Sequence, residues 1–222
     1  MYYHIHYLKI IITTCLICFP SAFIFFGSAV QMRKCTIARK NAIMTWVVYL
    51  ILISIVYIMG YLNNINISLS IWIVIGVGCG ILVIFLELAM AQYKIKRKFG
   101  YYTKIIRPPA SYIESFSFLN AILIIFAAAL EEILFRQIII LELYGLFDML
   151  LVGVILSCLL YAVNHIYFSV FSVAQKIVSG FIFSILFIFS GYNILVPIIT
   201  HCVQNLVLYL FGTYTYGKES KK

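Results

Sequence analysis

Residues 127–140 read "AAALEEILFRQIII" and place Glu131, Glu132 and Arg136 within a long stretch that otherwise carries no charge. A charged side chain in the middle of a bilayer costs at least about 2.5 to 3.5 kcal/mol, so such residues normally pair with one another or line a polar cavity. Whether these three side chains lie in a membrane or in a soluble protein depends on the composition of the whole chain.

The composition of the whole chain indicates a membrane protein. Of its 222 residues, 64% are hydrophobic and only 10% are charged, and the mean hydropathy is +1.08. These values lie outside the range of soluble domains and exclude a conventional soluble core. The apolar runs are roughly 20 residues long, which is the helix length that crosses a hydrocarbon layer of about 30 Å. We therefore predict an all-α fold, a polytopic bundle of transmembrane helices.

The apolar runs predict about seven spans. Their expected ranges are 10–31, 42–62, 68–92, 115–141, 147–168, 171–190 and 193–212. Lysine and arginine gather in the loops at 33–40 and 94–107, which the positive-inside rule assigns to the cytoplasm, with the N-terminus outside and the C-terminus inside. The net charge of +9 then reflects topology and attraction to anionic headgroups, and no nucleic-acid partner is expected.

Two features of the third span predict ordinary packing. Gly76 and Gly80 have the GxxxG spacing that permits close approach of two helices. Glu87 lies near the predicted inner end of the span, where its carboxylate reaches the membrane interface, and a structural role is favoured for it.

The spacing of the charged motif predicts an ion pair for one of its two glutamates. Glu132 and Arg136 are four residues apart, share a helical face and are expected to form an ion pair. Glu131 projects about 100° away around the helix, so the same arginine does not easily neutralise both glutamates. Glu131 is therefore a candidate base, although three such charges are also compatible with a purely structural polar cluster.

Two later spans each carry a histidine. The stretch "LLYAVNHIYF" places Tyr161 one helical turn before His165, and "NILVPIITHCVQNLVLY" places His201 and Asn205 at i and i+4. Pro197, one turn before His201, is expected to free a carbonyl and bend the last helix. A lone intramembrane histidine is usually a satisfied core residue, but histidines, an amide and a glutamate on three separate spans are less easily explained by packing.

The expected positions of the two histidines along the membrane normal argue against a shared site. If the fifth and seventh spans enter from the same side, His165 lies about 18 residues along its helix and His201 about 8, which separates them by roughly 15 Å in depth. We therefore expect residues 190–197, "SGYNILVP", to enter the bundle as a short non-helical or re-entrant segment.

At these residues the chain resembles the CPBP intramembrane proteases, also called CAAX-protease and bacteriocin-processing (Abi) proteins. The family pattern is EExxxR, then an aromatic residue with xxxH, then HxxxN. It matches, in this order, Glu131-Glu132-Arg136, Tyr161-His165 and His201-Asn205. The resemblance covers about residues 115–212, and its one departure is that the second motif usually begins with Phe and here begins with Tyr161.

The resemblance implies a helical-bundle endopeptidase that cuts peptide bonds inside or at the edge of the membrane. In family terms Glu131 would activate water, His165 would assist, and His201 with Asn205 would stabilise the oxyanion. Glu132, Arg136 and Tyr161 would support these residues. The expected regions are 1–110, an N-terminal three-span membrane region, 111–214, a CPBP/Abi-like catalytic core, and 215–222, a basic tail.

The family resemblance also implies the substrates and the location. Relatives trim prenylated proteins or take part in bacteriocin immunity and in leader or pheromone processing, so a membrane peptide or lipidated protein is the expected substrate. The Ile-, Tyr-, Phe- and Lys-rich composition favours a bacterium of low GC content, and hence the cytoplasmic membrane, with peptide processing favoured over prenyl-protein trimming.

A metal and other functions remain open at this point. Glu131, His165 and His201 could form a two-histidine, one-carboxylate zinc site, and the family is often labelled metalloprotease. No HExxH spacing is present, so metal-free chemistry without a cofactor is favoured and zinc stays possible. The main alternative is a catalytically silent membrane scaffold that regulates a sensor or transporter. A proton-relay transporter is disfavoured because the two halves show no repeat symmetry.

Overall fold

The computed structural model describes residues 65–102, 117–166 and 169–219, together with Val47, Leu50, Ile51 and Ser54. Within these ranges the chain consists of helices and short connections, and the one extended pairing is an isolated bridge between Asn66 and Asn193. The predicted all-α class is confirmed.

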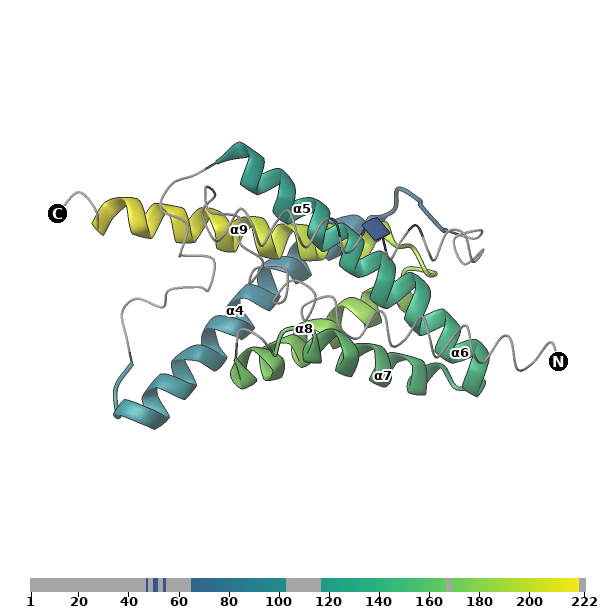
Figure 1. The fold of residues 1–222 in the computed structure, drawn as a ribbon, viewed down its shortest axis with the longest axis horizontal. Helices are drawn as coiled ribbons and strands as arrows, with labels where there is room; N and C mark the ends of the chain where they lie inside the picture. The colour runs from purple at the N-terminus through teal and green to yellow at the C-terminus, as the bar shows by residue number, and fades with distance from the viewer. Residues whose placement is uncertain are drawn as a thin grey trace.

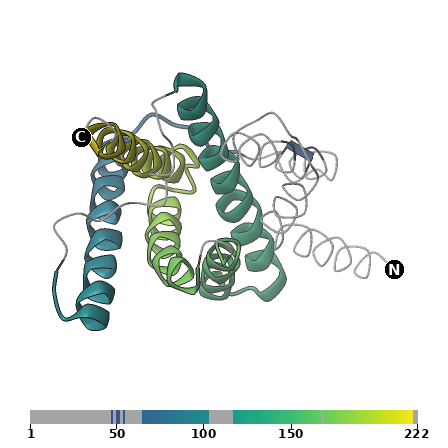
Figure 2. The same cartoon turned by 60° about the vertical axis from the view of Figure 1, so that its left-hand side comes forward.

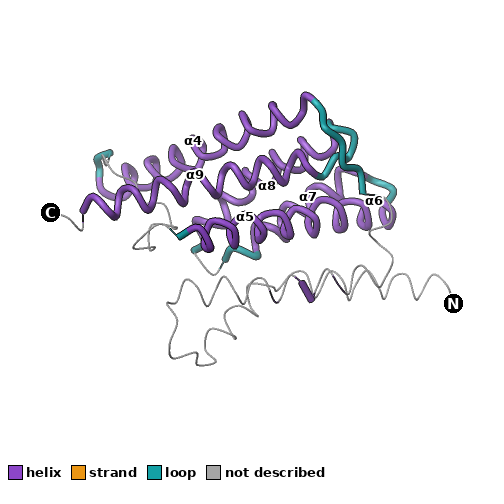
Figure 3. The backbone as a smooth tube through the Cα atoms, turned by 90° about the horizontal axis from the view of Figure 1, so that it is seen from above, coloured by secondary structure: helices purple, strands orange, loops and turns teal. Residues whose placement is uncertain are grey.

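Seven helical elements follow one another along the described chain. They are α4 (Ile71–Phe99), α5 (Phe118–Glu132), the π-helix η2 (Ile133–Ile140), α6 (Leu141–Phe147), α7 (Leu150–Val163), α8 (Val170–Phe189) and α9 (Leu195–Glu219). The elements α5, η2 and α6 form one continuous helix of 30 residues, Phe118–Phe147 (Figure 1). The long helices lie side by side in an elongated bundle (Figure 3).

Four helices are long and apolar enough to cross a membrane: α4, the continuous Phe118–Phe147 helix, α8 and the Leu195–Tyr214 part of α9. The helix α7 is apolar but only 14 residues long, shorter than the predicted span 147–168. The predicted spans 10–31 and 42–62 lie outside the described residues, apart from four positions of the second. The number of seven spans therefore stays a prediction, whereas a multi-pass membrane protein is supported.

The helix α4 extends past the predicted end of its span, through the basic residues of its last turn. It ends where Gly100 takes the left-handed conformation, with φ of 80°, and its N–H donates to the carbonyl of Lys96. A residue without Cβ adopts this conformation without strain, so Gly100 is a favourable helix terminator.

The predicted close approach at the third span is confirmed, and its partner is α9. A Cβ on Gly76 would lie 2.9 Å from Oγ1 of Thr200, and a Cβ on Gly80 would lie 2.6 Å from the backbone oxygen of Thr200. Gly76 also faces Val196 and Gly80 also faces Val203, so α4 and α9 run in the same direction. Figure 2 shows α4 beside α9 on one side of the bundle.

The turn between α7 and α8 lies at the basic end of α4. Nζ of Lys94 is 4.3 Å from the ring centroid of Phe171, and Nζ of Lys176 is 2.9 Å from Oε1 of Glu87. Glu87 thus joins α4 to α8 through an ion pair, in line with the structural role favoured for it. The basic end of α4 is the one expected in the cytoplasm.

The non-helical connection between α8 and α9 is shorter than expected. Residues 190–194 are non-helical, but Leu195, Val196 and Pro197 already belong to α9. Asn193 is fully buried, and its Nδ2 donates to the carbonyl of Ser68 at 2.6 Å. The expected non-helical segment is therefore confirmed for 190–194, where Asn193 and Ile194 are buried, and is wrong for 195–197.

The expected effect of Pro197 is also wrong. Pro197 is the third residue of α9, and the N–H groups of the first turn of a helix have no intrahelical acceptor. Proline at this point removes no hydrogen bond and frees no carbonyl, so it favours the start of the helix instead of bending it.

We predict that Gly80→Ala destabilises the protein and that Gly78→Ala does not. The new methyl group at position 80 would overlap the backbone of α9, which costs about 1–3 kcal/mol. At position 78 a Cβ meets nothing within 4 Å, and alanine favours the helix. Thermal unfolding of both variants in detergent provides the comparison. Equal melting temperatures would contradict the packing of α4 on α9.

Candidate active site

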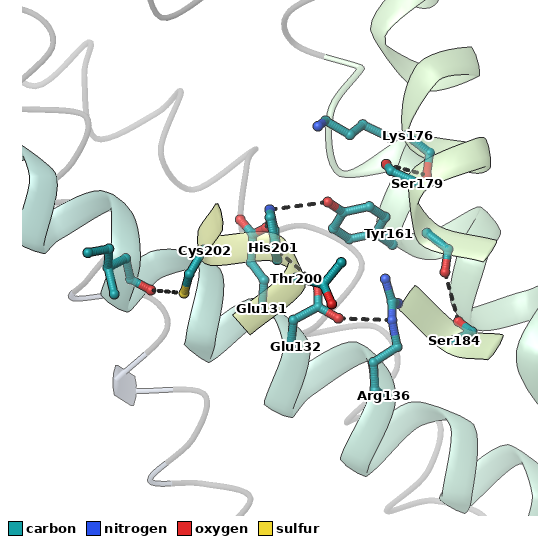
Figure 4. A network of polar contacts seen from close by, with 12 residues as sticks. Glu131, Glu132, Arg136, Tyr161, Lys176, Ser179, Ser184, Thr200, His201 and Cys202 are labelled. Carbon is teal, nitrogen blue, oxygen red and sulfur yellow. Dashed lines mark hydrogen bonds and ion pairs between the residues drawn. The ribbon is translucent and has the colours of Figure 1, made fainter. Parts of the chain in front are cut away.

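Residues from all three sequence motifs meet in the middle of the bundle (Figure 4). Glu131 and Glu132 end α5, Arg136 lies in η2, Tyr161 is near the end of α7, and His201 is in α9. Three segments far apart in the sequence therefore supply one polar cluster within otherwise apolar helices.

The centre of this cluster is the carboxylate of Glu132. Its Oε2 lies 3.0 Å from Nε of Arg136, which is the predicted i, i+4 ion pair. Its Oε1 accepts a hydrogen bond from Nδ1 of His201 at 2.8 Å. Glu132 and Arg136 are fully buried and His201 is 1% exposed. The second contact was missed from the sequence because its partners are 69 residues apart and on different helices.

Aromatic rings surround the buried arginine. The guanidinium carbon of Arg136 lies 4.8 Å from the ring centroid of Tyr161 and 5.8 Å from that of Phe183. Gly180 makes this arrangement possible, since a Cβ there would lie 2.9 Å from Cδ1 of Tyr161. Cation–π contacts of this kind are strongest where water is excluded, so they help to offset the burial of the charge.

The predicted span 115–141 lies almost wholly within the continuous helix Phe118–Phe147, in which Ile133–Ile140 form a π-helix. A π-helix is wider than an α-helix, and such segments occur often at functional sites. The hydroxyl of Ser157 donates to the carbonyl of Phe135 and lies 3.5 Å from Nη1 of Arg136. Ser157 on α7 thus binds the π-helical segment. The hydrophobic pattern of the sequence did not predict this contact.

The two nitrogens of His201 have different surroundings. Glu132 forms an ion pair with Arg136, and a carboxylate in such a pair accepts hydrogen bonds, so Nδ1 of His201 carries the hydrogen that Oε1 of Glu132 accepts. The other nitrogen, Nε2, lies 3.5 Å from the hydroxyl oxygen of Tyr161 and 3.9 Å from Oε2 of Glu131. In the neutral ring Nε2 is therefore an acceptor, placed between a phenol and a carboxylate.

His165 and His201 share one neighbour, so their rings lie closer together than the roughly 15 Å in depth expected from the sequence. The ring of Tyr161 lies 4.9 Å from that of His165 and 6.0 Å from that of His201, measured between centroids. His165 follows the end of α7, and its Nδ1 donates to the backbone oxygen of Tyr161 at 2.9 Å. Asn205 follows His201 by one helical turn and is half-buried.

The segment that contains these residues matches a known protein family. A family model described as "Type II CAAX prenyl endopeptidase Rce1-like" matches residues 114–207. This segment is therefore similar to the Rce1-like family of CAAX endopeptidases. The Rce1-like segment includes all three motifs and the whole polar cluster. No curated protein and no solved structure matches the chain.

The match of residues 114–207 to the Rce1-like family indicates an intramembrane peptidase that acts on a membrane-associated substrate. The resemblance stated from the three motifs is thereby confirmed. The roles of the individual residues are a separate matter and are argued from the geometry.

The zinc set considered from the sequence does not fit this geometry. In the part of the chain that the structure describes, no group of three His, Cys, Asp or Glu side chains is arranged to hold a metal ion. The absence of zinc at Glu131, His165 and His201 stays a prediction.

We predict that Glu132→Ala strongly destabilises the protein. It would leave the buried charge of Arg136 without its partner, which costs about 3–5 kcal/mol. The matched control is Glu87→Ala, which breaks the ion pair between Glu87 and Lys176. The side chain of Glu87 is 11% exposed and that of Lys176 is 15% exposed. The control should cost less because water reaches both groups. Yield from membranes and melting temperature test this.

A double variant separates the ion pair from the orientation of His201. Glu132→Leu combined with Arg136→Met removes both buried charges, so we expect stability to recover relative to Glu132→Ala. Activity should not recover, because Nδ1 of His201 would still lack its acceptor. A double variant with full activity would show that Glu132 acts only through Arg136.

Proposed function

We propose that this protein is an intramembrane endopeptidase that hydrolyses peptide bonds of membrane peptides or lipidated proteins, with Glu131 as the base that activates water. The observation that supports this most directly is the separation of 3.9 Å between Oε2 of Glu131 and Nε2 of His201. Atoms at this distance can both contact one water oxygen with hydrogen-bond lengths of about 2.8 Å. A carboxylate and an imidazole directed at one water form a general-base site.

The two adjacent glutamates then have different tasks. Glu132 is fully buried and is occupied by Arg136 and His201. The side chain of Glu131 is 14% exposed, so a substrate and its water have access to it. Because neighbouring residues on a helix point about 100° apart, one carboxylate supports the site from inside while the other faces the reaction.

In the proposed reaction Glu131 takes a proton from water as the water oxygen attacks the carbonyl carbon of the substrate. The tetrahedral intermediate collapses when the same proton passes from Glu131 to the leaving nitrogen. His165 assists at the mouth of the site, and Asn205 donates to the oxyanion with His201. His201 can donate through Nε2 only when its ring is protonated, since Nδ1–H is already directed at Glu132.

The location of the site supports entry of the substrate from the basic end of the bundle. His165 is half-buried and follows α7 at the turn that lies beside the basic end of α4. We infer that a membrane peptide or a lipidated C-terminal segment enters between these helix ends from the cytoplasmic side. Peptide processing in a bacterial cytoplasmic membrane is the favoured setting.

We predict that Glu131→Gln lowers the cleavage rate by at least about 100-fold, since general-base catalysis contributes about 10²–10⁴-fold. The variant should fold normally because Glu131 is partly exposed. The measurement is cleavage of a library of membrane-inserted and prenylated peptides by protein in lipid nanodiscs. The matched control is Glu142→Gln, a carboxylate about 16 Å further along the same continuous helix.

The control should retain the wild-type rate. Full cleavage by Glu131→Gln would remove Glu131 from the reaction. If neither the wild type nor any variant cleaves a peptide, and the motif residues are dispensable for every phenotype, the scaffold alternative is favoured instead.

We predict that activity survives chelation and that the purified protein holds well under one zinc ion per chain. The three candidate ligands do not form a metal cluster, whereas a glutamate base with hydrogen-bond donors suffices for hydrolysis. Metal content by mass spectrometry, with cleavage measured before and after chelation, tests this. Stoichiometric zinc, with activity lost on chelation and restored by Zn²⁺, would overturn the metal-free mechanism and keep the peptidase.

A further inference from the structure

In the proposed reaction Asn205 is the one donor to the oxyanion that needs no prior proton transfer. Glu131 is an acceptor when it acts as base, and Nε2 of neutral His201 is an acceptor because Nδ1 carries the hydrogen. An oxyanion needs donors placed at the position where its charge develops. Neither of these two groups supplies one until a proton has been transferred.

A donor lies beside them on a third helix. The hydroxyl oxygen of Tyr161 is 3.5 Å from Nε2 of His201, and the side chain of Tyr161 is fully buried. Since Nε2 is the acceptor of this pair, the phenol O–H is the donor. Figure 4 shows the hydroxyl directed at His201, on the side where Glu131 also lies.

The ring that carries this hydroxyl is fixed on several sides. Phe135 contacts it edge-on at 5.3 Å and Phe183 at 6.4 Å between centroids, and Arg136 lies against its face. Gly180 touches the ring where any side chain would collide with it. A donor held in this way needs little reorganisation when charge develops, which is the condition for effective oxyanion stabilisation.

Packing accounts for the ring but not for the hydroxyl. A phenylalanine would make the same ring contacts, and a hydroxyl buried away from water costs free energy unless it is hydrogen-bonded. At 3.5 Å the bond to Nε2 is at the long limit of hydrogen-bond distances. The hydroxyl is therefore oriented by His201 without being held strongly by it.

We propose that Tyr161 is a catalytic residue of this protein, whose hydroxyl turns from Nε2 of His201 to the substrate oxyanion and donates a hydrogen bond to it. The proposal rests on the peptidase function proposed above. Water attacks the carbonyl carbon, the carbonyl π electrons move to oxygen, and Glu131 carries the water proton to the leaving nitrogen. Tyr161 keeps its own proton throughout, so the step is balanced without a further reactant.

The test is Tyr161→Phe in the full-length protein in lipid nanodiscs, with a peptide that the wild type cleaves. We expect kcat to fall at least tenfold and KM to stay within twofold, because the lost hydrogen bond forms only in the transition state. The matched control is Tyr209→Phe. Tyr209 is also fully buried, and its hydroxyl is hydrogen-bonded to the backbone of Ser117 at the start of α5, so its loss should leave kcat unchanged.

The outcomes separate this proposal from the peptidase function itself. If the wild type cleaves, Glu131→Gln does not, and Tyr161→Phe keeps a kcat within twofold of the wild type, the peptidase stands and the role of Tyr161 is refuted. A change in KM alone, or a loss that follows the folded fraction as in Tyr209→Phe, also refutes it. No cleavage by the wild type would remove both proposals.

A second substitution covers the case in which Tyr161→Phe does not accumulate in membranes. Incorporation of 3,5-difluorotyrosine at position 161 keeps the hydroxyl and makes the phenol more acidic. A more acidic phenol is a stronger hydrogen-bond donor, so kcat should differ from that of the wild type by more than twofold while KM stays within twofold. The same replacement at position 209 should leave kcat unchanged. A kcat within twofold of the wild type at position 161 would overturn the proposal.

Discussion

The buried carboxylate of Glu132 joins the two helices that bring Arg136 and His201 to the candidate active site. It binds Arg136 within its own helix and Nδ1 of His201 on α9, so a single negative charge holds the Phe118–Phe147 helix and the last helix together. A charge at this depth is stable only with such partners. The same two contacts determine which nitrogen of His201 faces Glu131 and Tyr161, and therefore which atom takes part in any reaction.

The surroundings of Arg136 show how a helical bundle accommodates this ion pair. The guanidinium meets the faces of Tyr161 and Phe183, and the absence of a side chain at Gly180 lets the ring of Tyr161 approach. The π-helical turns that begin after Glu132 are bound in turn by Ser157, which satisfies the carbonyl of Phe135. Tyr161 thus belongs both to the packing around the arginine and to the polar group around His201.

Local patterns predicted the features that depend on local physics. Hydropathy gave the all-α membrane fold, the i, i+4 spacing gave the pair Glu132–Arg136, and the GxxxG spacing gave the close approach of α4. The spacing did not name α9 as the partner, nor did it reveal the bond from Glu132 to His201, because one sequence holds no information about which helices meet. The π-helix and the short α7 were missed because hydrophobic periodicity does not distinguish them from regular spans. The roles of Glu131, His165 and Asn205 remain predictions.

The placement of α4 bears on how much of the chain the site requires. The helix lies in the predicted N-terminal region 1–110, outside the family match at 114–207. Yet Gly76 and Gly80 contact Thr200, the residue before His201, and Ser68 and Glu87 bind Asn193 and Lys176. These contacts fix the start of α9 and the first half of α8. A cut at residue 110 would expose the face of α9 that glycine now brings against α4, so the geometry at His201 depends on residues from both predicted regions.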